Sequence, residues 1–134
     1  MERRRNFNFL TANVSSSMFA GISNGKNCLI PDRTAVTLED LKEIKDLRSS
    51  INNDGLLGTL TDIGIKSTPV SNTKFQIEPG DTIYVIVPPT GSNISAYKNE
   101  ERLPDDISIN IIERWRCIPV AELTTYIQVE KELK

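Results

Sequence analysis

Two short polar segments carry the side chains that could hold an anionic ligand. Serine hydroxyls and the backbone N–H groups of a turn can bind phosphate oxygens, and an arginine can grip a phosphate through two parallel hydrogen bonds. An asparagine at a strand end could hydrogen-bond a base or a ribose, and a nearby aspartate could orient the arginine or accept a ribose hydroxyl. All these residue types also occur in ordinary turns and caps, so a structural role stays open. The candidates are Asn13, Ser15, Ser16 and Ser17 in the first segment, and Arg102 and Asp105 in the second.

Composition excludes several catalytic classes. The chain contains no histidine, so neither a Ser-His-Asp nor a Cys-His triad can form. Cys28 and Cys117 lie far apart in the sequence with neither a zinc nor a redox spacing, and we expect two reduced thiols. No glycine-rich loop of the Walker or dinucleotide-binding type occurs. We therefore predict no metal site and no cofactor, and we favour a binding protein over an enzyme.

Length and charge indicate one soluble domain. A chain of 134 residues with 38% apolar content suits a single packed core. Its net charge of −2 creates no field that would attract duplex nucleic acid or an anionic membrane. The longest apolar run, residues 83–87, is far shorter than the roughly 20 residues of a membrane span. Residues 1–5 are basic, but no apolar segment follows them, so we expect a disordered N-terminus and no export signal.

The first third of the chain predicts a strand and a helix. Alternating apolar residues indicate a strand over residues 6–14, and the Gly, Asn and Pro content of residues 20–32 indicates an irregular loop. Thr37, with Asp40 three positions later, makes a variant of the capping box that predicts a helix beginning at residue 38. Apolar residues then recur every three to four positions, so we expect this helix to cover residues 38–51.

A second, shorter helix is predicted after the break at residues 52–55. It begins at Leu56, and Gly64 could close it in a left-handed conformation. The two helices outline a helix-turn-helix, but neither carries the basic side chains that phosphate contacts with DNA would require.

The following segment predicts an antiparallel hairpin. Residues 73–77 and 82–87 indicate strands, and Glu78-Pro-Gly-Asp81 indicates a tight turn between them. The second strand is apolar on both faces and is therefore expected to be central in its sheet.

The last third predicts an exposed loop over residues 90–107, mobile at 90–101, and a strand over 108–120. Trp115 lies between two arginines and fits a core position, although stacking on a nucleobase is the alternative. Residues 121–134 could form a closing helix or a strand. Together these elements predict a single domain of the α/β (α+β) class, with one mixed or antiparallel sheet and two helices packed on one face.

Four motifs in this order resemble the viral type III anti-CRISPR ring nuclease family, small α/β domains that dimerise and bind cyclic oligoadenylate. In that family the asparagine and serine of the first motif lie at the ligand, and a glycine ends a helix before a Pro-Val-Asn-Arg sequence. The resemblance covers roughly residues 7–106. The motifs are Phe9-Leu-Thr-Ala-Asn-Val-Ser15, Gly64-Ile-Lys-Ser-Thr-Pro-Val-Ser-Asn72, Glu78-Pro-Gly-Asp81 and Arg102-Leu-Pro-Asp105.

The chain also departs from the family pattern. Asn53 stands in the region where the family carries the histidine that acts as general acid, Asn72 stands where it carries an arginine, and Asp105 replaces a glutamate. Only histidine titrates between pH 5 and 8 without a perturbed environment, so cleavage by the family's route is not expected. Asn53 and Asn72 complete the set of residues that we expect at the ligand.

The resemblance implies a viral anti-defence protein that acts in the host cytoplasm. We expect it to bind and sequester a cyclic nucleotide messenger, either a cyclic oligonucleotide or a cyclic ADP-ribose variant, as a homodimer or higher oligomer. An active ring nuclease with relocated chemistry is one alternative, and a viral structural or interaction protein with a decayed site is another.

Overall fold

The computed structural model describes residues 6–12, 25–32, 36–70, 76–87, 94–105, 107, 109 and 111–123. The described chain forms six strands, two α-helices and two 3₁₀ turns. In chain order these are β1 (Asn8–Thr11), β2 (Asn27–Asp32), α2 (Leu38–Lys42), β3 (Leu47–Ser49), α3 (Asp54–Ile63), β4 (Thr68–Pro69), β5 (Thr82–Val87), η1 (Ile94–Tyr97), β6 (Ile111–Pro119) and η2 (Val120–Glu122).

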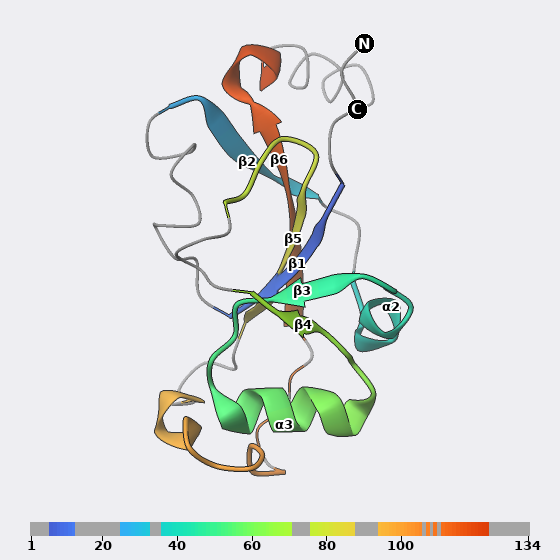
Figure 1. The fold of residues 1–134 in the computed structure, drawn as a ribbon, viewed down its shortest axis with the longest axis vertical. Coiled ribbons are helices and arrows are strands. Elements are labelled where there is room, and N and C mark those ends of the chain that lie inside the picture. The colour runs from blue at the N-terminus through green and yellow to red at the C-terminus, as the bar shows by residue number, and fades with distance from the viewer. Residues whose placement is uncertain are drawn as a thin grey trace.

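The six strands form one mixed sheet in the order β2-β6-β5-β1-β3-β4 (Figure 1). β1 runs parallel to both β5 and β3, and β3 runs parallel to β4. β6 is antiparallel to β5 and to β2. The predicted α/β class with a single sheet is therefore confirmed.

Alternating side chains divide the core between the two faces of the sheet. Leu10 of β1 and Ile86 of β5 pack with Leu41 of α2 and Leu60 of α3, so both helices cover the same face, as predicted. A smaller cluster on the other face includes Phe9 and its β5 and β6 neighbours. Period-two alternation in neighbouring strands is the cause, because it sends consecutive side chains to opposite faces.

The capping box at the start of α2 is confirmed. The hydroxyl of Thr37 accepts a hydrogen bond from the backbone N–H of Asp40 at 3.2 Å, and the Asp40 carboxylate accepts one from the N–H of Thr37 at 2.8 Å. The predicted extension of this helix to residue 51 is wrong, because α2 ends at Lys42. Residues 47–49 instead pair with β1. The apolar residues at 47 and 51 fit a strand as well as a helix, and only the long-range pairing decides between them.

The expectation of an irregular loop over residues 20–32 is corrected for its last part. Residues 27–32 form β2, which pairs with β6 from Asn27 opposite Pro119 to Asp32 opposite Arg114. Pro31 lies within this strand, where proline is tolerated because β2 is at the edge of the sheet.

The predicted turn at residues 78–81 is present, but the predicted hairpin is wrong. Gly80 has a φ of 99°, and the N–H of Asp81 bonds to the carbonyl of Glu78 at 3.1 Å. β5 is central, as expected, but β1 and β6 occupy both of its edges. Residues 76 and 77 are not in a strand, and residues 73–75 of the predicted strand lie outside the described residues.

The carboxylate of Asp81 ties this turn to the start of β1. It is fully buried and accepts hydrogen bonds from the N–H groups of Phe7 at 3.2 Å and Glu78 at 2.9 Å.

Within the described chain, no helix has the length and apolar character needed to cross a membrane.

Candidate ligand-binding site

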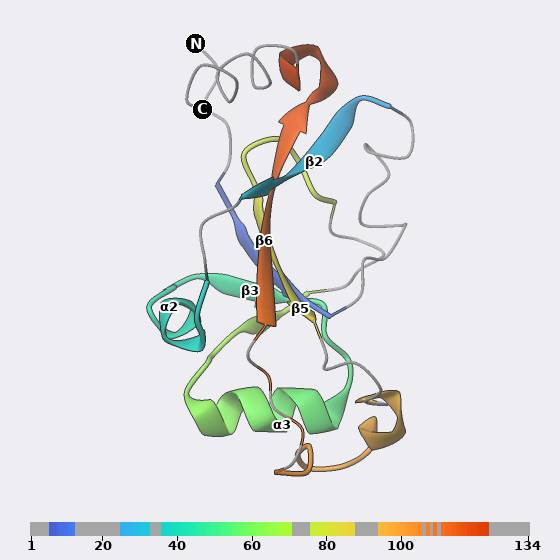
Figure 2. The same ribbon diagram turned by 180° about the vertical axis from the view of Figure 1, so that it is seen from behind.

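Residues 94–105, which we call the strap, lie against α3 at one end of the molecule (Figure 2). The strap begins with η1. Two polar contacts fix its first half: the side-chain amide of Asn53 donates to the carbonyl of Ile94, and the N–H of Asp54 donates to the carbonyl of Lys98, both at 2.9 Å. The start of α3 and the first half of the strap are therefore held together by one side-chain and one backbone hydrogen bond.

Two glycines on α3 let the strap backbone approach the helix closely. A Cβ atom added at Gly55 would lie 2.5 Å from the carbonyl oxygen of Tyr97. A Cβ atom at Gly58 would overlap the carbonyl oxygen of Glu101. The two positions are three apart, so they share one face of the helix. The backbone of the strap packs directly on this face of α3, and any residue larger than glycine at these two positions would collide with it.

The second half of the strap is anchored by Leu103. Its side chain is 1% exposed and belongs to the main core. Its N–H donates to the hydroxyl oxygen of Thr59 at 2.7 Å, and that hydroxyl donates to the carbonyl of Gly55 at 3.0 Å. These contacts fix the backbone immediately after Arg102.

Arg102 reaches from the strap to two carboxylates. One terminal nitrogen lies 3.6 Å from the carboxylate of Asp62 in the last turn of α3, and the other donates to Asp105 at 3.1 Å. The Arg102 side chain is 55% exposed and those of Asp62 and Asp105 are 56% and 91% exposed, so water reaches all three. The predicted proximity of Arg102 and Asp105 is therefore present in the structure.

A surface hollow of about 480 Å³ opens beside this arginine. The residues that line it include an arginine, an aromatic residue, two acidic residues and apolar residues. The lining residues are Tyr97, Glu100, Arg102, Leu103, Pro104 and Asp105.

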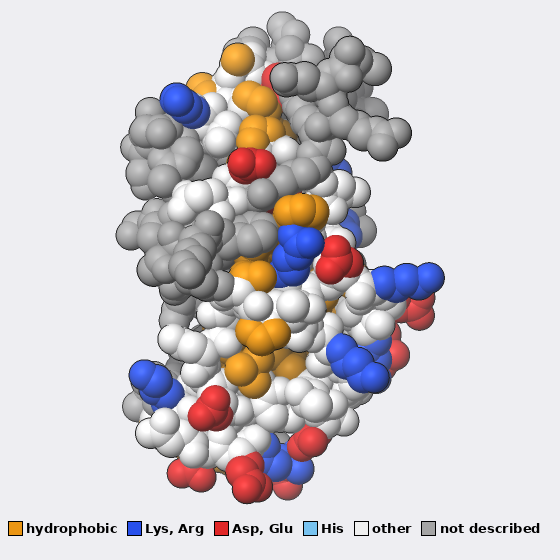
Figure 3. Space-filling view, viewed as in Figure 1, with side chains coloured by type: hydrophobic (Ala, Val, Ile, Leu, Met, Phe, Trp, Pro, Cys, Tyr) orange, Lys and Arg blue, Asp and Glu red, His pale blue; other side chains and the backbone are white. Residues whose placement is uncertain are grey.

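The charges around the hollow are mostly negative. Figure 3 shows acidic side chains gathered at the end of the molecule that carries α3. A free anion that approaches Arg102 is therefore repelled by the neighbouring carboxylates until one of them moves away. The arrangement suits a ligand that offers a phosphate to the guanidinium together with hydroxyl or amino groups to the carboxylates.

Asn53 has a role in the protein itself. Its carboxamide oxygen caps α3 by accepting from the N–H of Leu56 at 3.0 Å, while its nitrogen makes the contact with Ile94. Asn13, Ser15, Ser16, Ser17 and Asn72 lie outside the described residues.

Sequence reasoning missed Asp62, Tyr97, Glu100 and Pro104. An aromatic residue within a polar loop was a usable signal for Tyr97. Nothing local marked Asp62, because its position beside Arg102 depends on how the strap docks on α3.

Trp115 lies on the other face of the sheet from the helices. It packs half-buried against the smaller cluster and is not one of the buried core residues, and it borders an apolar hollow of about 270 Å³. The Nε atom of the preceding residue, Arg114, lies 2.9 Å from the Asp32 carboxylate, close enough for an ion pair although the Nε–H is not aligned for a hydrogen bond. The interaction with Asp32 raises the pKa of Arg114 above its ordinary value. Arg114 is therefore engaged and does not provide a free phosphate contact beside the indole.

No three Cys, Asp or Glu side chains among the described residues cluster as metal ligands. No family model, no curated protein and no solved structure matches the chain. The resemblance to the ring nuclease family therefore stays a prediction from its motifs.

Proposed function

We propose that the chain binds a cyclic nucleotide messenger in the hollow beside Arg102 and holds it without cleaving it. The observation that carries this proposal is the half-exposed Arg102 side chain at the edge of a hollow that Tyr97 and Asp105 also line. These groups match the three parts of a nucleotide, which are a phosphate, a base and a ribose.

The phosphate takes the place of Asp105 on the guanidinium. Asp105 makes only an exposed ion pair, and such pairs contribute little, about 0–1 kcal/mol. A phosphate can make two parallel charge-assisted bonds to the same arginine. Once displaced, the Asp105 carboxylate is free to accept a ribose hydroxyl.

Storage without turnover follows from the absence of histidine. Cleavage of a phosphodiester requires proton transfer, and no other side chain titrates near neutral pH without a strongly perturbed environment. The role we propose is the one that the motif resemblance implies, removal of a defence messenger in the cytoplasm of a host by a viral protein. A symmetric cyclic ligand would let two copies of Arg102 act together in a homodimer.

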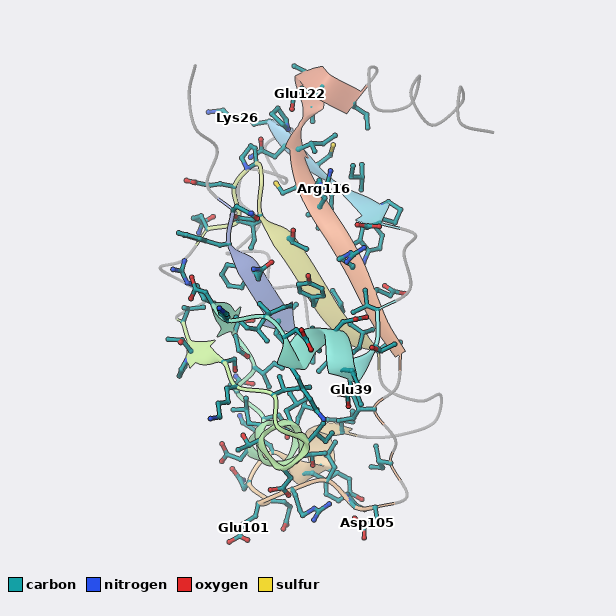
Figure 4. The ribbon with its side chains drawn as sticks, turned by 90° about the vertical axis from the view of Figure 1, so that its right-hand side faces the viewer. Lys26, Glu39, Glu101, Asp105, Arg116 and Glu122 are labelled. Carbon is teal, nitrogen blue, oxygen red and sulfur yellow. The ribbon has the colours of Figure 1, made fainter. Side chains whose placement is uncertain are left out.

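Isothermal titration calorimetry against a panel of cyclic nucleotides tests the proposal. We expect one class to bind the wild-type protein and Arg102→Ala to weaken that binding at least tenfold. Arg116→Ala is the matched control, because Arg116 is an exposed arginine of β6 far from the end that carries Glu101 and Asp105 (Figure 4). No heat for any member of the panel at micromolar protein would overturn the proposal.

Product analysis separates binding from catalysis. The complex is denatured after incubation and the released ligand is examined by mass spectrometry. Intact cyclic ligand supports storage, whereas linear product would show a ring nuclease. If Arg102→Ala alters no ligand-dependent property, a structural or interaction role is the better account.

A further inference from the structure

The hydroxyl of Thr59 stands out among the contacts that surround the candidate site. It lies on α3, outside the hollow, and yet it holds the backbone next to Arg102. We infer that Thr59 is the positioning residue of the site, and this inference rests on the proposed function.

A hydrogen bond within α3 fixes the orientation of the Thr59 hydroxyl. Its hydrogen points to the carbonyl of Gly55 one turn earlier, a bond that helical threonines commonly make. The oxygen lone pairs are therefore directed away from the helix, where the N–H of Leu103 donates at 2.7 Å. The hydroxyl acts at once as donor to the helix and as acceptor for the strap.

The N–H of Leu103 depends on this acceptor. Leu103 as a whole residue is 1% exposed, so its backbone N–H is poorly placed to exchange its protein partner for water. A buried amide without an acceptor is costly, and the strap would have to shift to reach solvent. Any such shift moves Arg102, the preceding residue, relative to Asp62 on α3.

The ion pair of Arg102 with Asp62 depends on the position of the strap. The two terminal guanidinium nitrogens contact carboxylates from two different elements, α3 and the strap. That arrangement holds only while the strap is seated on the helix. We therefore expect the Thr59 latch, meaning the Thr59 hydroxyl with its bond to Leu103, to control how well Arg102 is pre-organised for a phosphate.

The sequence offers a closely matched set of variants. Thr59→Val removes the hydroxyl and keeps the shape, and Thr59→Ser keeps the hydroxyl. Thr61→Val is the control, because Thr61 is exposed and its hydroxyl bonds one turn back, to the carbonyl of Leu57, rather than to the strap. Thr59→Val and Thr61→Val therefore make the same replacement of a hydroxyl by a methyl group at two positions of one helix.

Hydrogen exchange of the Leu103 amide, measured without ligand, is the first readout. We expect Thr59→Val to speed this exchange about tenfold, while Thr59→Ser and Thr61→Val stay near wild type. Unchanged protection in Thr59→Val would overturn the inference, because the latch would then not hold the strap.

Ligand affinity is the second readout. With the cyclic nucleotide that the wild-type protein binds, we expect Thr59→Val to weaken binding about fivefold to tenfold and Thr59→Ser to restore it. A loss of protection with unchanged affinity would also overturn the inference. A wild-type protein that binds no cyclic nucleotide would instead defeat the proposed function, and that result is obtained before any variant is made.

Discussion

Replacing Gly58 with alanine sets two well-known effects against each other. Alanine is the better helix former by about 1 kcal/mol, so at an open position this change would stabilise α3. At Gly58 the new Cβ atom overlaps the carbonyl oxygen of Glu101. That oxygen belongs to the backbone, so it can move away only if the strap moves with it.

The losses from such a movement exceed the gain in helix propensity. Burial of the Leu103 side chain is worth about 2 kcal/mol, and its N–H bond to Thr59 adds about 1 kcal/mol. We expect Gly58→Ala to lower the free energy of unfolding by about 1–3 kcal/mol after the propensity gain is subtracted. A small domain has only about 5–15 kcal/mol of stability in total, so the change is large enough to measure.

Urea unfolding followed by circular dichroism is the appropriate assay. A native state with a released strap exposes less additional surface on unfolding, so the slope of free energy against urea should also fall. Thr61→Ala is the control, because this exposed position of the same helix also gains propensity, and the Thr61 hydroxyl bonds to Leu57 of the helix rather than to the strap. A Gly58→Ala protein that is as stable as wild type, with an unchanged slope, would refute the close approach of strap and helix.

Two further outcomes follow from the same structure. Asp81→Asn should destabilise the protein by about 2–4 kcal/mol in urea unfolding, because the N–H of Phe7 or of Glu78 would then face the amide NH₂ of the asparagine. A change in the free energy of unfolding below about 0.5 kcal/mol would contradict the role given to this carboxylate in the turn. Asp105→Asn should raise the affinity for a phosphate-bearing ligand about twofold to fivefold in calorimetry, because it removes the carboxylate that competes for Arg102. Asp46→Asn, which removes an exposed aspartate beside Arg48, is its control. Weaker binding in Asp105→Asn would mean that the bond of this carboxylate to the ribose outweighs its competition for Arg102.

Local signals in the sequence were sufficient for the elements that local chemistry determines. The capping box at Thr37 and the left-handed end of α3 at Gly64, with a φ of 104°, depend on residues within a few positions of each other. The central place of β5 could be predicted because a strand with apolar residues on both faces must be covered on both faces.

The errors arose where distant segments decide the structure. Residues 47–49 satisfy a helical and an extended pattern equally well, and their parallel pairing with β1 selects the extended form. The glycine and asparagine residues before β2 favoured a loop in the sequence-based prediction. The strand forms because its backbone pairs with β6, which lies far away in the sequence.

The candidate site was only half predictable for the same reason. Arg102 and Asp105 are three positions apart and were identified together, whereas Asp62 joins them only after the strap docks. The pair Gly55 and Gly58 inside a helix was the one available sign of a close backbone approach.

The prolines of the two outermost strands have a consequence for the behaviour of the protein in concentrated solution. Pro31 lies in β2 and Pro69 in β4, and neither can donate a backbone hydrogen bond to an incoming chain. The N–H of Val70, which follows β4, points toward β3 and bonds to the carbonyl of Ser49. The nitrogen of Pro69 therefore faces the open edge of the sheet, where it has no hydrogen to donate. Both borders of the sheet thus discourage the stacking of molecules into continuous ribbons that precedes fibril growth, and any symmetric assembly of this protein should use side-chain surfaces instead.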